Sequence, residues 1–323
     1  MSDIAKINAV APADFSKIRG IAKGDIAKVD GLDMPSSGTQ YVSGATMHLV
    51  AANATSYSGP GATTWNDISG SSNNVSLING PTEPTAGDDF IRFDGVDDYG
   101  KHTFVSGEYF YGDASNTAQF LTASCSFVAS FPEDGTTGLV ARDAICQFGS
   151  RKQSSGMRCF QMRAEYRGII VLLAYGSAVF IKWPSNDSTN FQYNSASGYY
   201  EPKPDRVLNM GLRWQRSPAT GYRHVGGYLN GAPYASSGFT GGSSQQSGIA
   251  SESRTNYTYA NASAVRRGQA EWLLAGQHNS SGNLITNTLQ SDMREFLLYE
   301  GALTDAEFLQ NHNAYVSAYG PLN

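Results

Sequence analysis

The stretch Val207-Leu208-Asn209-Met210-Gly211-Leu212-Arg213-Trp214 shows the pattern that decides the fold of this chain. Large apolar residues occupy every second position, and polar or small residues stand between them. Because successive side chains of a β-strand point to opposite faces, this pattern predicts a strand with one face on a core. It is typical of an antiparallel sheet that is covered on one side.

Seven further strand-like runs are separated by turn residues, and several of them alternate in the same way. They are Met47 to Ala51, Phe90 to Phe93, Ser124 to Ser130, Ile169 to Ala174, Val225 to Leu229, Trp272 to Ala275 and Met293 to Leu298. Such a series of short strands predicts an all-β protein in which two sheets pack into a β-sandwich.

One helix is predicted, near the C-terminus. Thr304-Asp305-Ala306-Glu307 matches a capping box, in which hydroxyl and carboxylate satisfy free backbone N–H groups at the start of a helix. Gly320-Pro321 would end it. We expect the helix to protect an edge of the sandwich, and the residues expected to cover the sandwich are Phe308, Leu309, Ala314, Tyr315 and Ala318.

Composition narrows the class of protein. The chain has 323 residues, only 16% of them charged, and a net charge of −5. Low charge with abundant Gly and Tyr is typical of an all-β protein with long polar loops, and the charge gives no reason to expect nucleic acid or an anionic membrane as partner. Residues 1–6 lack the apolar core of a signal peptide, so we expect synthesis in a cytoplasm without export.

Three cysteines, Cys125, Cys146 and Cys159, form no Cys-x-x-Cys pair. Free cysteine is among the most buried residue types, so these are predicted to be buried thiols.

A short repeat with an 11-residue period fills the beginning of the chain. Its units are Asp3 to Val10, Asp14 to Ile21 and Asp25 to Leu32. A repeat too short to bury its own apolar face must stack on neighbouring copies or on another chain. The apolar residues expected to make this attachment are Ile4, Ile7, Phe15, Ile18, Ile26 and Val29.

Each repeat is predicted to be a small β-turn unit. Arg19-Gly20 and Asp30-Gly31 suit a tight turn between two strands of about three residues. Lysines, arginine and aspartates balance in this segment, which argues against a basic arm for nucleic acid. The expected organisation is repeats over residues 1–35, a breaker-rich linker over 36–40 and one domain over 41–323.

Four segments, in this order, resemble the laminin G-like, concanavalin A-like jelly-roll domains common in bacteriophage structural proteins. They are Trp65 to Gly70 followed by Asn79-Gly80-Pro81, Ile91 to Tyr99, Gly226 to Gly231, and Arg294 to Tyr299 running into Leu303 to Glu307. The resemblance covers roughly residues 41 to 320 and implies a jelly-roll β-sandwich.

The repeats resemble tandem Asp-Ile-x-Lys-Ile-x-Gly-Val units that begin many phage virion proteins, particularly from marine phages. This resemblance implies a virion protein made in the host cytoplasm. The repeats would attach it to other virion proteins, of capsid or tail, and the jelly roll would face outward on the virion surface.

Catalysis is an alternative to binding, because the same sandwich also hosts glucanases and a fold alone does not settle function. Retaining glycosidases need two carboxylates about 5 Å apart, and the glucanases that this fold resembles carry them as Glu-x-Asp-x-Glu. That run is missing here. Asp292 and Glu295 would point to opposite faces of a regular strand. The five histidines are scattered, and no Gly-x-Ser-x-Gly elbow lies between a strand and a helix. We expect no enzyme.

Calcium is the ion that the sequence fits best. Asp94, Asp97 and Asp98 supply hard oxygen ligands around Gly95, and the resembled fold often holds Ca²⁺ at loop ends. The alternative is that these are turn carboxylates, since Asp-Gly is a turn signal. No other cofactor is expected.

Two long loops mix aromatic and amide residues, as lectin-like sites do. They run from Trp183 to Tyr200 and from Tyr234 to Asn261, and loops of this length are usually functional or disordered. The candidates for glycan or partner binding are Trp183, Asn190, Tyr193, Tyr199, Tyr200, Tyr257 and Tyr259. The alternative is that the rings pack against neighbouring subunits in a lattice.

The leading interpretation is a non-enzymatic head decoration or head-fibre protein, present as a homo-oligomer or in many copies per particle. A tail-fibre or other host-adsorption protein that binds a surface glycan is the first alternative. A polysaccharide hydrolase of the same fold and a bacterial adhesin are further alternatives.

Overall fold

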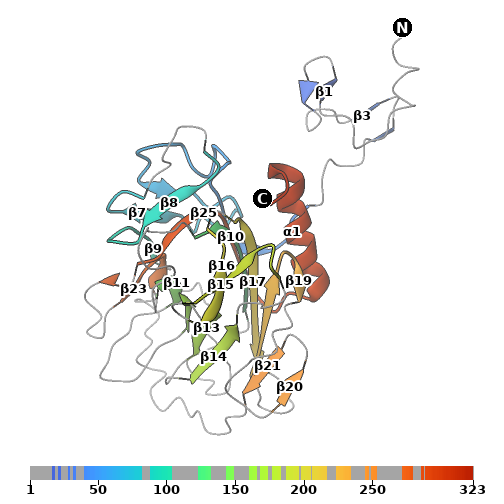
Figure 1. Cartoon of the computed structure of the whole chain (residues 1–323). Coiled ribbons are helices and arrows are strands. Elements are labelled where there is room, and N and C mark those ends of the chain that lie inside the picture. The colour runs from blue at the N-terminus through green and yellow to red at the C-terminus, as the bar shows by residue number, and fades with distance from the viewer. Residues whose placement is uncertain are drawn as a thin grey trace, which may run out of the picture.

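Strand β17 (Leu208–Arg216) lies inside a nine-stranded antiparallel sheet of the computed structural model (Figure 1). Leu208, Met210 and Leu212 are buried in the core, so the predicted alternation of this strand is confirmed. The order across the sheet is β20 (Ser244–Gln246), β21 (Ile249–Glu252), β18 (Arg223–Leu229), β17, β10 (Ala123–Ser130), β25 (Gln290–Glu300) and β5 (Ala45–Val50), with β19 (Ala232–Pro233) on β18 and β8 (Ile91–Asp94) on β25.

A second antiparallel sheet of eight strands faces the first. Its order is β14 (Ser177–Lys182), β13 (Gly168–Leu173), β12 (Phe160–Glu165), β11 (Asp143–Phe148), β22 (Glu271–Leu274), β9 (Tyr99–Thr103), β7 (Val75–Ile78) and β6 (Thr64–Trp65). Buried side chains of both sheets form one core, and the rings of Trp272 and Phe296 meet across it with centroids 5.0 Å apart. The predicted β-sandwich is therefore confirmed, and each of the eight predicted strands is present.

The structure describes most of the sandwich and parts of what precedes it. The described residues are 17–18, 21–22, 28–29, 32–33, 40–81, 88–103, 123–131, 143–148, 160–165, 168–173, 177–182, 187–195, 198–204, 206–216, 223–233, 244–246, 249–252, 271–278, 285–286 and 288–322. Within them, no helix has the length and apolar character that crossing a membrane requires.

Two very short hairpins lie in the repeat segment. Strand β1 (Lys17–Ile18) pairs with β2 (Ile21–Ala22), and β3 (Lys28–Val29) pairs with β4 (Leu32–Asp33). Each strand of the second hairpin begins 11 residues after its counterpart, since 17 becomes 28 and 21 becomes 32. The two predicted strands of the unit are confirmed for the second and third repeats, as two-residue strands that pair with each other. The predicted turns Arg19-Gly20 and Asp30-Gly31 lie outside the described residues. The first repeat lies outside the described residues.

Helix α1 (Asp305–Tyr319) begins as predicted. Thr304 and Glu307 form the capping box in both directions, and the Thr304 side chain accepts from the Glu307 backbone N–H. Phe308, Ala314 and Tyr315 are buried, as expected. The carboxylate of Asp305 ties this end of the helix to the sheet.

The helix covers a face of the nine-stranded sheet, so the expectation that it protects an edge was wrong. Phe308 stacks on Tyr228 of β18 with centroids 3.8 Å apart, and both belong to a second apolar cluster with Leu297 of β25. Glycine permits this approach, because a Cβ at Gly211 would lie 2.6 Å from the Phe308 ring. Leu309 and Ala318 were also expected to cover the sandwich. The geometry of the helix turns them to solvent instead.

The Asn-Gly pair at the end of the segment Gly226 to Gly231 makes a hairpin turn. Asn230 and Gly231 connect β18 to β19 with φ of 49° and 77°. Two consecutive positive φ values are the mark of a type I′ turn, whose twist matches that of the strands beside it. The same turn lies directly under α1, because a Cβ at Gly231 would be 2.8 Å from His312.

Two of the three cysteines are described. Cys125 and Cys146 are buried free thiols, as predicted, and burial raises the pKa of Cys125 to about 12. A thiol with so high a pKa stays protonated and unreactive at neutral pH. Cys159 lies outside the described residues.

Candidate functional site

The predicted glycan candidates that the structure describes gather on one hairpin. Strands β15 (Phe191–Asn194) and β16 (Tyr199–Pro202) form a two-stranded sheet of their own. Asn190, Tyr193 and Tyr200 are described with their side chains, and Tyr199 lies on β16. Trp183, Tyr257 and Tyr259 lie outside the described residues. We call residues 187–195 and 198–204 the tyrosine hairpin.

Two tyrosines meet on this hairpin. Tyr193 and Tyr200 are direct cross-strand partners, and their rings meet edge to face with centroids 5.5 Å apart and planes at 63°. Tyr200 packs partly against the main core, whereas 59% of Tyr193 is exposed. The inner ring therefore supports the outer ring and limits its motion, while one large aromatic side chain is left to solvent.

The base of the tyrosine hairpin is fixed by one aspartate and one buried ring. Asp187 accepts hydrogen bonds from the backbone N–H groups of Thr189 and Asn190, each at 3.1 Å, and from the Asn190 side-chain amide at 2.8 Å. Phe191 is 1% exposed and belongs to the main core. Because strand β15 begins with a core residue, the orientation of the hairpin relative to the sandwich is set by packing.

A buried carboxylate supports the far end of the tyrosine hairpin. Glu201 is 5% exposed, and the Asn194 amide donates to both of its oxygens, at 3.2 and 3.1 Å. The Lys203 ammonium donates to the Ser188 carbonyl at 2.6 Å. The hairpin is thus a rigid support for an exposed aromatic ring, which is the arrangement that can stack on a flat apolar surface.

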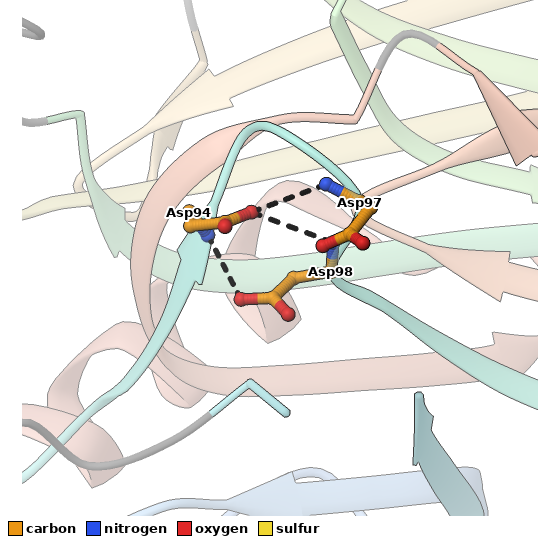
Figure 2. A group of neighbouring side chains, drawn as sticks. All are labelled: Asp94, Asp97 and Asp98. Atoms are coloured by element: carbon orange, nitrogen blue, oxygen red, sulfur yellow. Dashed lines mark hydrogen bonds between the residues drawn. The ribbon is translucent and has the colours of Figure 1, made fainter. Parts of the chain in front are cut away.

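The predicted calcium ligands also lie together, in a tight turn between β8 and β9. One carboxylate oxygen from each of Asp94, Asp97 and Asp98 lies within 4.8 Å of the others, and Figure 2 shows all three around the turn. We call residues 94–98 the acidic loop. Gly95 is required in it, because its φ is +77° and a Cβ there would lie 2.9 Å from Gln290.

The backbone hydrogen bonds of the turn use only some of the carboxylate oxygens in the acidic loop. Asp94 Oδ1 accepts from the backbone N–H groups of Val96 at 2.7 Å, Asp97 at 3.3 Å and Asp98 at 3.4 Å. Asp98 Oδ2 accepts from the Asp94 N–H at 3.1 Å. Burial, and then the negative charges of Asp94 and Asp97, raise the pKa of Asp98 to about 6. A divalent cation would relieve this repulsion, so the loop is suited to Ca²⁺, and calcium binding stays a prediction.

The two carboxylates weighed for glycosidase chemistry are each held by a basic partner. Asp292 makes a two-pronged ion pair with Arg92, at 2.6 and 2.7 Å, and Glu295 lies 3.0 Å from His48 Nε2. The expectation that they point to opposite faces rested on regular alternation along β25. That premise was wrong, because the register with β10 shifts here, and Met293 and Phe296 both enter the core.

Sequence reasoning missed a buried polar layer between α1 and the sheet. Glu295, the partner of His48, is fully buried. The centroid of the Tyr41 ring lies 4.5 Å from that of the His48 ring. Burial, followed by the nearby Glu295 carboxylate, raises the pKa of Tyr41. Val42 N–H donates to Asn311 Oδ1 of α1 at 2.8 Å. This layer ties the start of the sandwich to the C-terminal helix, and residues so far apart in sequence give no local signal of it.

Among the predicted attachment residues, Ile18 and Val29 lie on β1 and β3 at equivalent positions of the two hairpins. The others lie outside the described residues, and these are Ile4, Ile7, Phe15 and Ile26.

Comparison with known proteins gives similarity to solved structures only. No protein-family model matches this chain, and no curated protein sequence does. The binding domain of botulinum neurotoxin serotype D is 12% identical with a TM-score of 0.46, and the alignment covers 83% of this chain and 51% of that one. The binding domain of Paraclostridial Mosquitocidal Protein 1 is 12% identical with a TM-score of 0.44, over 84% and 52%.

An enzyme is among the similar structures as well. Trypanosoma rangeli sialidase in complex with sialic acid is 11% identical with a TM-score of 0.45, over 83% of this chain and 32% of that one. This chain thus matches a third to a half of the length of these proteins. Similarity at this level adds nothing to the strand pairing, on which the assignment of the fold rests.

Proposed function

We propose that this chain is a non-enzymatic binding protein of a phage particle, displayed on the surface as a head decoration or head-fibre protein and attached through its N-terminal repeats. The observation that carries the proposal is the recurrence of one hairpin at a fixed interval of 11 residues. Two-stranded units of this size are marginal alone, and they gain stability by stacking on one another or on a partner.

The sandwich supports the outward half of the proposal. Its described surface carries the exposed Tyr193 ring on the tyrosine hairpin and the acidic loop. The carboxylates of Asp292 and Glu295, the candidates for hydrolysis, are paired with Arg92 and His48. These features suit binding without turnover.

The first experiment tests the attachment. The double variant Ile18→Asp/Val29→Asp places a charge on each described hairpin and should abolish incorporation into particles, measured by blotting purified virions. Its thermal melt should match that of the parent, since the sandwich is unchanged. Normal incorporation of this variant would contradict attachment through the repeats.

The second experiment tests the location. Intact virions are labelled with an antibody against the sandwich and imaged by electron microscopy. Label spread over the head is expected for a decoration or head-fibre protein. Label confined to the tail would replace this role with the second candidate, a host-adsorption protein, which the exposed Tyr193 ring favours.

A further inference from the structure

The tyrosine hairpin presents one aromatic ring that the fold of the sandwich leaves exposed. Tyr193 is 59% exposed although its strand begins at a core residue and its ring is supported from the side by Tyr200. We propose that this hairpin is a saccharide-binding site, in which a neutral sugar stacks its apolar C–H face on the Tyr193 ring. The inference rests on the proposed display of the sandwich to the outside.

Among the described residues, the separation of this ring from other exposed apolar side chains favours a sugar over a protein as the ligand. In the described part of the chain, the large exposed apolar side chains are Val96, Tyr193 and Leu309, and they lie on a turn, a hairpin and the helix respectively. Protein interfaces present a contiguous apolar centre, which scattered side chains do not form. The residues on either side of Tyr193 in β15, Gln192 and Asn194, are polar, and alternation along the strand places them on the opposite face of the hairpin. A single exposed ring matches a ligand that has one small apolar face, as a pyranose has.

The charges of the hairpin point to a neutral sugar. Its described residues include two carboxylates, Asp187 and Glu201, against the ammonium of Lys203. That ammonium already donates to the Ser188 carbonyl. The negative charge that these residues carry together therefore disfavours a sialylated, sulfated or phosphorylated sugar through long-range repulsion, and it leaves a neutral sugar unaffected.

The fixed position of the ring makes stacking effective. Asp187 caps the turn before β15 with three hydrogen bonds, and Phe191 holds the strand in the core. A ring that is already ordered loses little further freedom when a sugar stacks on it.

The test measures binding of the full-length protein to an array that carries neutral hexose and N-acetylhexosamine oligosaccharides beside their sialylated and sulfated counterparts. We expect binding to one or more neutral members. Tyr193→Ala should weaken it at least tenfold, and Tyr193→Phe should retain it, because the ring and not the hydroxyl provides the stacking surface. Gln192→Ala changes an exposed neighbour on the same strand and serves as the matched control. Thermal melts of all three variants establish that they fold.

Three outcomes would overturn the inference: no binding to any member, binding to acidic members alone, or equal binding by Tyr193→Ala and the parent. None of them bears on attachment to the particle. Incorporation of Tyr193→Ala into virions, measured in parallel, separates the two proposals, since only failure of the Ile18→Asp/Val29→Asp experiment counts against attachment.

Discussion

Two segments of this sandwich, Trp65 to Gly70 and Ile91 to Tyr99, each contain a turn built around an aspartate. The two turns use their carboxylates differently. Asp67, just after the buried Trp65, accepts hydrogen bonds at both oxygens. Its donors are the backbone N–H groups of His48, Ser69 and Asn73 and the hydroxyl of Ser69, at 2.8 to 2.9 Å. In the acidic loop, Asp94 accepts the backbone hydrogen bonds at a single oxygen, and two further carboxylates lie beside it.

The difference teaches that residue type alone does not separate an aspartate whose two oxygens the fold uses from one that leaves ligand oxygens free. A carboxylate with both oxygens occupied by backbone donors is part of the fold. Three carboxylates with oxygens within 4.8 Å of one another repel each other, and a bound cation would relieve this repulsion. Four experiments test this contrast, in order of decreasing effect.

Trp65→Ala should give the largest loss. Trp65 is fully buried, so truncation removes a large apolar side chain and leaves a cavity, at a cost of about 3–5 kcal/mol of unfolding free energy. Chemical denaturation measures the loss. An unfolding curve that overlays the parent would show that this first segment does not depend on the core.

Asp67→Asn and Asp94→Asn form a matched pair. At Asp67 the new amide would face the donors of Ser69 and Asn73 that now bind Oδ2, so about 2–3 kcal/mol should be lost. At Asp94 the carbonyl oxygen of asparagine can take over the role of Oδ1, so the cost should stay below about 1 kcal/mol. Equal costs, measured by denaturation, would remove the distinction between the two turns.

Calcium should stabilise the parent and not a variant of the acidic loop. A ligand at ten times its Kd stabilises the folded state by about 1.4 kcal/mol, and the parent should show a calcium-dependent rise in Tm that chelator reverses. Asp97→Asn removes one ligand from the exposed side of the group and should reduce the rise. A Tm that calcium leaves unchanged in the parent would favour turn carboxylates without an ion.

Asp98→Asn should give the smallest effect, and one that depends on pH. Because the pKa of Asp98 is raised to about 6 from 3.8, the folded state holds this proton more tightly than the unfolded state does. The parent therefore loses stability as pH rises from about 4 to about 6, and the loss persists above that range. In the absence of divalent cations, the variant should melt about 1–3 °C higher than the parent at about pH 7.5 and no higher near pH 3.5. A constant difference across this range would point to a cause other than the carboxylate charge.

Sequence alone was sufficient where the signal is local. Alternation located the strands around Leu208 and Met210, a capping box located the start of α1, and Asn230-Gly231 gave the turn between β18 and β19. The 11-residue period and its Arg-Gly and Asp-Gly pairs predicted the two hairpins for the same reason, because turn chemistry and strand pairing act over a few residues. The candidate sites were likewise found from local composition, as groups of aspartates and of aromatic and amide residues.

Only the tertiary structure decided how those groups are used. The register shift on β25 places Met293 and Phe296 on one face, against the alternation of the sequence, because a bulge depends on pairing with β10. His48 and Glu295 meet across 247 positions of sequence. Tyr193 is exposed, whereas Phe191, two positions before it on the same strand, lies in the core and Tyr200 packs partly against that core. The sequence by itself determined the strands, the turns and the types of side chain near each site. Packing between distant segments determined which carboxylates are paired and which ring faces solvent, because burial and charge pairing are properties of the assembled core.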